Sequence, residues 1–171
     1  MTGVPQRPLL FLDVDGPLIP FGPGDHPAYR PAPSPHAGSN PLLARIDPAH
    51  GPRLRALPCE LVWATTWMDD ANECVAPILG LPRLPMVSWP HDPAAEERDQ
   101  RHGLHWKTRA LVAWAAGRPF AWVDDEITGR DRAWVAARHP GPALAHRVDP
   151  GRGITNADYR ALGEWLRAAV G

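Results

Sequence analysis

In Leu9-Leu10-Phe11-Leu12-Asp13-Val14-Asp15-Gly16, an apolar run passes directly into two carboxylates and a glycine. Four apolar residues bounded by turn-forming residues are typical of a buried strand in a parallel sheet. Asp13 and Asp15 then lie at the carboxyl end of this strand, the edge at which open α/β sheets bind ligands. Because side chains alternate along a strand, both carboxylates point to the same side, with the Val14 carbonyl between them.

Two neighbouring carboxylates repel each other unless a positive charge neutralises them. Mg²⁺ is the simplest candidate, since it prefers oxygen ligands and commonly completes its shell with water and phosphate oxygens. Taken alone, however, an Asp-x-Asp motif fits a strand that runs into a solvated acidic turn equally well. The rest of the chain has to decide between these two interpretations.

Length and composition limit the class of protein. A chain of 171 residues fits a single domain, 1–171, with modest insertions. The formal net charge of −1 does not indicate bulk attraction to nucleic acid or to a membrane, although a local basic groove for nucleic acid is compatible with it. No apolar stretch reaches the ~18 residues of a membrane span. Cys59 and Cys74 are isolated and no signal peptide is apparent, so we expect a reduced, cytoplasmic protein whose oligomeric state is open.

Predicted strands and helices alternate along the chain. Besides Leu9–Leu12, strands are predicted over residues 60–66, 84–89, 120–123 and 143–148. Helices are predicted over 47–57, 69–79, 104–116 and 128–138, and from 155 to the end of the chain, the last two opening with T-x-x-D capping boxes. This order predicts a three-layer α/β/α, Rossmann-like domain with a parallel sheet of about five strands.

Two segments interrupt this alternation. Residues 17–58 hold eleven of the twenty-two prolines, a density that forbids regular central strands and continuous helix. Within them, residues 42–46 are predicted as a short edge strand, and most of the remainder as a flap that faces the substrate. Residues 90–104 are predicted as a small insertion, either a loop or a short helix. Neither segment is long enough for a lid domain, so we expect a minimal cap or none.

The strand ends bring further polar residues to the edge that carries Asp13 and Asp15. Thr65 ends the second strand, and Asp124 and Asp125 follow the strand at 120–123. Because the carboxyl ends of parallel strands share one edge of the sheet, these side chains are predicted to converge.

Lys107 is the only lysine beside seventeen arginines. It lies near the amino end of the helix before the strand at 120–123, and such a helix starts at the carboxyl edge of the sheet. Acidic groups, a hydroxyl and an ammonium together predict a site that binds a metal through carboxylates and a phosphoryl group through the metal, lysine and hydroxyl. Thr66 is an alternative to Thr65, and Arg109 is an alternative to Lys107.

Four motifs, in this order, resemble those of haloacid dehalogenase (HAD) superfamily phosphohydrolases: Asp-x-Asp-Gly after a buried strand, a strand ending in Thr, the lysine, and the acidic pair. The resemblance covers nearly the whole chain. The WATTW stretch at 63–67, the WVDDE stretch at 122–126 and the GIT-x-x-D stretch at 153–158 further resemble the small HAD domain of Swiss Army Knife RNA-repair proteins.

The resemblance implies a Mg²⁺-dependent phosphatase. Asp13 would attack phosphorus and form an aspartyl-phosphate, Asp15 would protonate the leaving group and then activate water, and Thr65 and Lys107 would hold the phosphoryl oxygens. The metal candidates are Asp13, the Val14 carbonyl, Asp15, Asp124 and Asp125. The alternative is a catalytically degenerate module that binds a phosphorylated ligand or partner without turnover.

An open site with a minimal cap suits a large phosphorylated substrate, such as a nucleic-acid end or a phosphoprotein, although a nucleotide is also compatible. Trp67, Trp89 and Trp106 are predicted at or near the carboxyl edge of the sheet. An indole there can stack on a nucleobase, and plain packing around the site is the alternative. The histidines, His105 among them, lack metal-ligand spacing, so we expect them to be solvated.

Overall fold

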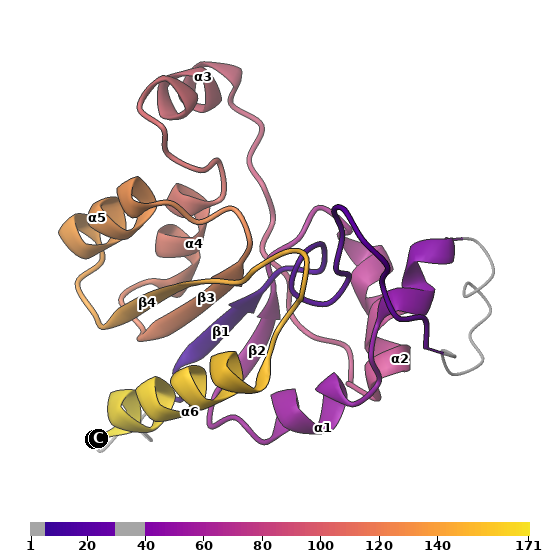
Figure 1. Ribbon diagram of the computed structural model, residues 1–171. Coiled ribbons are helices and arrows are strands. Elements are labelled where there is room, and N and C mark those ends of the chain that lie inside the picture. Colours follow the sequence, from indigo (N-terminus) through magenta and orange to yellow (C-terminus); the bar gives the residue numbers. More distant parts are fainter. Residues whose placement is uncertain (1–5, 30–39) are drawn as a thin grey trace.

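The computed structural model describes residues 6–29 and 40–171 of the chain (Figure 1). Within these residues, a parallel sheet has the order β2-β1-β3-β4 and consists of β1 (Leu9–Leu12), β2 (Glu60–Trp63), β3 (Phe120–Asp124) and β4 (Ala143–Arg147). In the register of the sheet, Leu9 is paired with Glu60 on one side and with Phe120 on the other. Because every pairing is parallel, the carboxyl ends of all four strands share one edge, as the sequence predicts.

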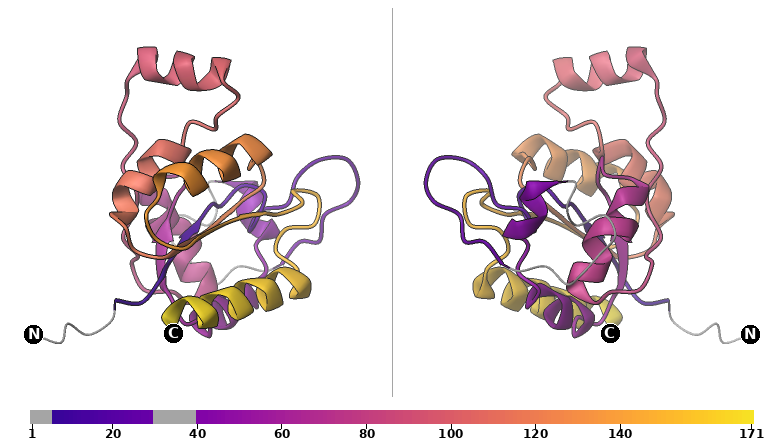
Figure 2. Two further views of the ribbon diagram at one scale, coloured as in Figure 1. Left: turned by 90° about the vertical axis from the view of Figure 1, so that its left-hand side faces the viewer. Right: turned by 90° about the vertical axis from the view of Figure 1, so that its right-hand side faces the viewer.

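β1 is buried on both faces, which explains its uninterrupted apolar sequence. Leu10 and Leu12 belong to one core cluster, and Leu9 and Phe11 belong to the other. The first cluster contains side chains from α1 (His50–Arg55), α2 (Ala76–Leu79) and α6 (Asn156–Val170). The second contains side chains from α4 (Thr108–Ala115) and α5 (Gly129–Arg138). Helices therefore cover both faces of the sheet (Figures 1 and 2), and the predicted three-layer α/β/α fold is confirmed.

The two predicted capping boxes are present. The Thr128 side chain accepts a hydrogen bond from the Asp131 amide at the start of α5, and Thr155 does the same for Asp158 at the start of α6. In both cases the aspartate carboxylate in turn accepts a hydrogen bond from the threonine amide. Two N–H groups at the start of each helix, which would otherwise be unpaired, are thereby satisfied.

Two predicted strands are not strands in the structure. Residues 42–46 lie in and after a 3₁₀ helix, η1 (Pro41–Arg45), because proline fits the first turn of a helix and Asn40 caps it through the Leu42 amide. Residues 84–89 make only an isolated bridge between Met86 and Trp63. Pro85 and Pro90 have no N–H to continue a ladder, so within the described residues the sheet has four strands rather than about five.

The segment predicted as a helix over 69–79 is divided. It opens as a π-helical turn, η2 (Ala71–Val75), and continues as α2. Pro77, which has no N–H to donate, is the second residue of α2 and follows the π-helical turn without a break in helical structure. None of the helices in the described part of the chain is long and apolar enough to cross a membrane.

The two predicted insertions differ in how they pack. The part of the flap after β1 is attached to the loop before α6, since the Phe21 amide donates to the Pro150 carbonyl and the Ile154 amide donates to the Pro17 carbonyl. Residues 30–39 of the predicted flap lie outside the described residues. The insertion at 90–104 holds α3 (Pro93–Arg101), which stands apart from the sheet beyond α4 (Figures 1 and 2).

Candidate active site

Three buried charged side chains meet at the carboxyl edge of the sheet. Lys107 Nζ lies 2.8 Å from Asp124 Oδ2 and 3.2 Å from Asp13 Oδ2. The exposed fractions are 4% for Lys107, 7% for Asp13 and 1% for Asp124. Charges buried to this extent are tolerated only when they are paired, so the single lysine of the chain holds two carboxylates together.

The local structure explains why these three groups converge. Asp13 directly follows β1, and its amide continues the sheet by donating to the Val123 carbonyl. Asp124 is the last residue of β3, and its Oδ1 accepts a hydrogen bond from the Glu126 amide at 3.0 Å. Lys107 is the residue immediately before α4, so the start of this helix delivers the ammonium to the strand ends.

Burial dominates the electrostatics of the site. It raises the pKa of Asp13 to about 7, although Lys107 opposes this shift, and the neighbouring Asp124 raises the pKa further. Burial also raises the pKa of Asp125 to about 6, with Asp124 again contributing. For Lys107, burial lowers the pKa, but the charges of Asp13 and Asp124 outweigh burial and leave the pKa above its usual value. The lysine is therefore a permanent cation among crowded carboxyl groups.

A hard divalent cation fits this donor set. Asp13, Asp124 and Asp125 each offer a carboxylate oxygen, and these oxygens lie within 4.8 Å of one another. Three carboxylates against one ammonium leave an excess of negative charge, and all the donors are oxygens, which suits Mg²⁺. Gly16 makes room for this cluster, because a Cβ at its position would lie 2.7 Å from Asp125 Cγ.

The Val14 carbonyl, which is predicted as a metal ligand, already has hydrogen-bond partners in the structure. It accepts hydrogen bonds from the Leu18 and Ile19 amides, both at 3.0 Å, and these use both of its lone pairs. The turn formed by Gly16 folds the following residues back onto the strand end, which the Asp-x-Asp-Gly pattern alone does not reveal. Within the described residues, the Asp15 carbonyl accepts no such bond and is the better candidate of the two.

Asp15 takes a different place from Asp13. Its carboxylate is not part of the cluster of three carboxylates among the described residues. Instead, Asp15 Oδ2 accepts a hydrogen bond from Trp67 Nε1 at 3.0 Å. The prediction that Asp15 is also a metal ligand through its carboxylate is therefore not supported. Trp67, which the sequence suggested only as a stacking or packing residue, orients this carboxylate.

The structure distinguishes between the alternatives that the sequence left open. Thr65, two residues after β2, is 2% exposed, and its Oγ1 accepts a hydrogen bond from the Trp67 amide at 3.2 Å, whereas Thr66 is exposed. Arg109 turns away from the carboxylates of the site, because its Nε donates to Asp99 at 2.7 and 2.8 Å. Thr65 and Lys107 are thus better placed than Thr66 and Arg109.

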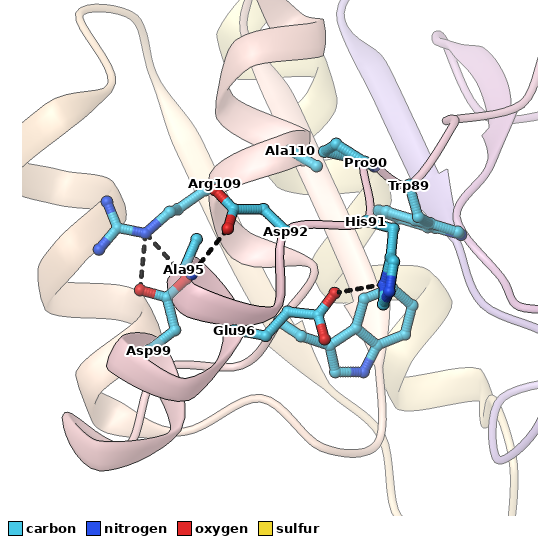
Figure 3. A pocket seen from close by; sticks show the side chains of 10 residues that line it. Trp89, Pro90, His91, Asp92, Ala95, Glu96, Asp99, Arg109 and Ala110 are labelled. Atoms are coloured by element: carbon cyan, nitrogen blue, oxygen red, sulfur yellow. Dashed lines mark hydrogen bonds and ion pairs between the residues drawn. The ribbon is translucent and has the colours of Figure 1, made fainter.

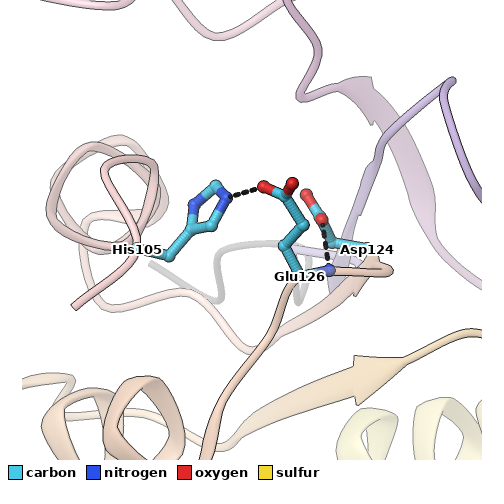
Figure 4. Close-up of side chains that lie close together, drawn as sticks. All are labelled: His105, Asp124 and Glu126. Atoms are coloured by element: carbon cyan, nitrogen blue, oxygen red, sulfur yellow. Dashed lines mark hydrogen bonds and ion pairs between the residues drawn. The ribbon is translucent and has the colours of Figure 1, made fainter. Parts of the chain in front are cut away.

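His105 and Glu126 border the site although sequence reasoning did not select them. The His105 side chain is only 8% exposed, so the expectation that it is solvated is wrong. Its Nδ1 accepts from the Lys107 amide at 3.1 Å, so Nε2 carries the proton and donates to Glu126 Oε2 at 2.8 Å (Figure 4). Their positions in the sequence could have pointed to them, because His105 precedes Lys107 by two residues and Glu126 follows Asp124 by two residues.

One family model matches the chain, over residues 9–159, and it describes the HAD domain in Swiss Army Knife RNA repair proteins. Searches of the curated proteins and of the solved structures gave no significant match. The matched range begins at β1 and ends within α6, so it contains the whole sheet and every residue of the candidate site.

Proposed function

The chain belongs to the family of HAD domains found in Swiss Army Knife RNA repair proteins, which indicates a phosphohydrolase-type function, and we propose that it is a Mg²⁺-dependent phosphatase acting on a phosphate monoester. The observation that carries this proposal is the contact of Lys107 with both Asp13 and Asp124 at the strand ends. A buried ammonium flanked by carboxylates can hold a phosphoryl group beside a nucleophile. A solvated acidic turn has no such group.

Asp13 is the proposed nucleophile. One of its carboxylate oxygens forms a bond to phosphorus while the bond from phosphorus to the ester oxygen breaks, which gives an aspartyl-phosphate and a free alcohol. Lys107 and Thr65 hold the non-bridging oxygens and stabilise the charge that they carry. Phosphate monoesters hydrolyse so slowly in water that the site has to lower the barrier by on the order of 20 kcal/mol, and dividing the reaction into two steps makes this attainable.

Asp15 is the proposed proton carrier. It donates a proton to the departing ester oxygen, then accepts one from the water that attacks the aspartyl-phosphate and regenerates Asp13. Its hydrogen bond to Trp67 keeps the carboxylate oriented apart from the three clustered carboxylates. When bound, Mg²⁺ would be held by Asp13, Asp124 and Asp125 and would offset the negative charge of the phosphoryl group.

Phosphate release from a panel of esters tests the proposal. The panel consists of an aryl phosphate, sugar phosphates, phosphopeptides, and 3′- and 5′-phosphorylated oligonucleotides, each measured with Mg²⁺ and with a chelator. We expect Mg²⁺-dependent release by the wild type and none by Asp13→Asn. Glu164→Gln makes the same carboxylate-to-amide change on the exposed face of α6 and should retain full activity.

The opposite results have a defined meaning. If the wild type binds phosphorylated ligands but releases phosphate from no ester of the panel, the chain is a binding module rather than a phosphatase. Activity that survives in Asp13→Asn, or that is insensitive to the chelator, would also contradict the proposal.

A further inference from the structure

A cavity with aromatic walls lies beside the candidate active site, and the proposed hydrolysis does not account for it. Its volume is about 300 Å³, and it opens between α3 and α4 (Figure 3). Trp89 and Trp106 line it with ring centroids 4.9 Å apart and ring planes at 76°. Trp106 is 40% exposed, so part of its indole is accessible from the cavity.

Each indole is linked to a residue that is proposed to hold the phosphoryl group. Lys107 Nζ lies 5.6 Å from the centre of the Trp106 ring, and Trp89 Nε1 donates to the Thr65 carbonyl at 3.0 Å. Trp106 and Trp89 thus lie directly beside the two residues that are proposed to hold the phosphoryl group. A phosphate at Lys107 would therefore present its own nucleobase to Trp106.

The charges that line the cavity exclude a phosphate from it. Asp92, Glu96 and Asp99 contribute carboxylates. Arg109 is already bonded to Asp99, and His91 Nδ1 lies 3.5 Å from Glu96 Oε1. Such a lining repels anions but accepts hydrogen bonds from N–H groups. A flat, uncharged ring with N–H donors is not repelled and can donate hydrogen bonds to these carboxylates. The unsubstituted ring edge of a phosphotyrosine offers them no donor.

His105 fixes the position of Trp106. The two rings stack with centroids 5.5 Å apart and planes at 29°, and His105 is itself held by Glu126 and by the Lys107 amide. A stacking surface that is rigid before binding loses little conformational entropy when a ligand arrives. This accounts for the hydrogen bond between the buried His105 ring and the exposed Glu126 carboxylate, which the proposed reaction does not use.

We propose that this cavity binds the nucleobase of the nucleotide that carries the phosphate, stacked on Trp106. The inference rests on the proposed function for the position of the phosphate, and it names the substrate class as a phosphorylated nucleotide or nucleic-acid end.

Equilibrium binding tests the inference separately from catalysis. Fluorescence anisotropy is measured with Mg²⁺ and a chain in which Asp13→Asn prevents turnover. The probes are short labelled RNAs with a 3′ or 5′ terminal phosphate, each compared with the same RNA lacking the base of the phosphorylated nucleotide. Because stacking on an aromatic side chain is worth about 1–3 kcal/mol per base, we expect the intact end to bind about 5- to 150-fold more tightly.

Second-site variants identify the stacking residue. Trp106→Ala should abolish the preference for the intact end, and Trp106→Phe should retain most of it, which separates lost stacking from lost folding. Trp114→Ala is the matched control, because Trp114 lies on α4 with 37% exposure and does not line the cavity. It should keep the full preference.

Four results would overturn the inference: equal binding of the intact and baseless ends, binding of neither, a preference that survives in Trp106→Ala, or stronger competition by a phosphotyrosine peptide than by a nucleoside monophosphate. A failure of the proposed function would appear instead as an absence of phosphate release by the wild type, which this binding measurement does not involve. Competition by a mononucleotide as strong as that by an RNA end would identify the free nucleotide as the ligand and support the inference.

Discussion

Asp15 and Asp13 are two residues apart, yet their surroundings give them different roles. Asp13 is paired with Lys107 and lies in the cluster of three carboxylates, whereas Asp15 is half-buried and bonded to the Trp67 indole. A group that only moves protons should matter for turnover and not for metal affinity. This difference can be measured.

We predict that Asp15→Asn lowers kcat at least about 100-fold, because general acid–base catalysis typically contributes 10²–10⁴. The Mg²⁺ affinity, measured by calorimetric titration, should remain close to that of the wild type. Trp67→Phe removes the indole N–H that donates to Asp15 but keeps an aromatic ring, and it should give a smaller loss of kcat with the same Mg²⁺ affinity. A large loss of Mg²⁺ affinity in Asp15→Asn with nearly normal kcat would reverse the assignment of roles.

Gly16 is required by the metal cluster as well as by the turn. It has φ +95°, and an added Cβ would lie 2.7 Å from Asp125 Cγ. We therefore predict that Gly16→Ala weakens Mg²⁺ binding, because Asp125 has to move. Gly22→Ala is the matched control, since Gly22 has φ +109° in the same segment but nothing within 4 Å of the added atom.

Both glycine variants should lose stability, by about 1–3 kcal/mol, because a positive φ strains an alanine. Urea denaturation measures this loss, and calorimetry measures the Mg²⁺ affinity. If Gly22→Ala weakens Mg²⁺ binding as much as Gly16→Ala, backbone strain rather than the contact with Asp125 is responsible.

At the scale of elements, the start of α6 couples stability to pH. Asp158 Oδ2 accepts hydrogen bonds from the Thr155 amide and hydroxyl at 2.7 and 2.8 Å, and Oδ1 lies 2.8 Å from His146 Nε2. Burial raises the pKa of Asp158, but these hydrogen bonds outweigh burial and leave the pKa below its ordinary value of 3.8. Because the pKa is lower in the folded chain, the stabilisation is complete above pH 3.8 and is lost as the pH falls through the folded value.

We predict that Asp158→Asn lowers the free energy of unfolding by about 1 kcal/mol near neutral pH, the usual value of a helix cap. The difference from the wild type should shrink as the pH is lowered below 3.8, because the wild-type carboxyl then also becomes neutral. Urea titrations over a pH series measure both quantities, and Glu164→Gln on the same helix should show no difference. A deficit that does not change with pH would mean that the charge of Asp158 is irrelevant to the cap.

Elements with a strong local signal were predicted well, and those that depend on their neighbours were not. The apolar run of β1 and the T-x-x-D starts of α5 and α6 determine local structure by themselves. Residues 84–89 have strand-like composition, but prolines at both ends limit them to one bridge beside Trp63. The π-helical turn η2 has no recognised sequence signal and was missed.

At the scale of the whole molecule, parallel topology converts distant motifs into one site. Asp13, Lys107 and Asp124 are far apart in the sequence, and the order β2-β1-β3-β4 with helices on both faces brings them together. That convergence could be predicted, because strand ends and helix starts share one edge of a parallel sheet. The occupied Val14 carbonyl, the Trp67–Asp15 bond and the cavity between α3 and α4 could not, because they depend on side-chain and loop geometry.

The two proposals together describe a phosphatase that recognises its substrate from two sides. Lys107 and Thr65 would hold the phosphoryl group, and Trp106 would hold the attached base. α3 contributes one wall of the cavity, so this short insertion takes the place of the lid domain that the chain lacks within its described residues.

Trapping of the phosphoenzyme tests whether Asp13 is the nucleophile. The wild type is mixed with Mg²⁺ and a substrate carrying a radioactive phosphate, quenched in acid, in which aspartyl-phosphates survive, and digested for peptide mapping. We predict that the label is found on the peptide containing Asp13 and is absent from the same peptide of Asp13→Asn. Label on another residue, or active turnover that leaves no label on the chain, would contradict the assignment of Asp13 as the nucleophile.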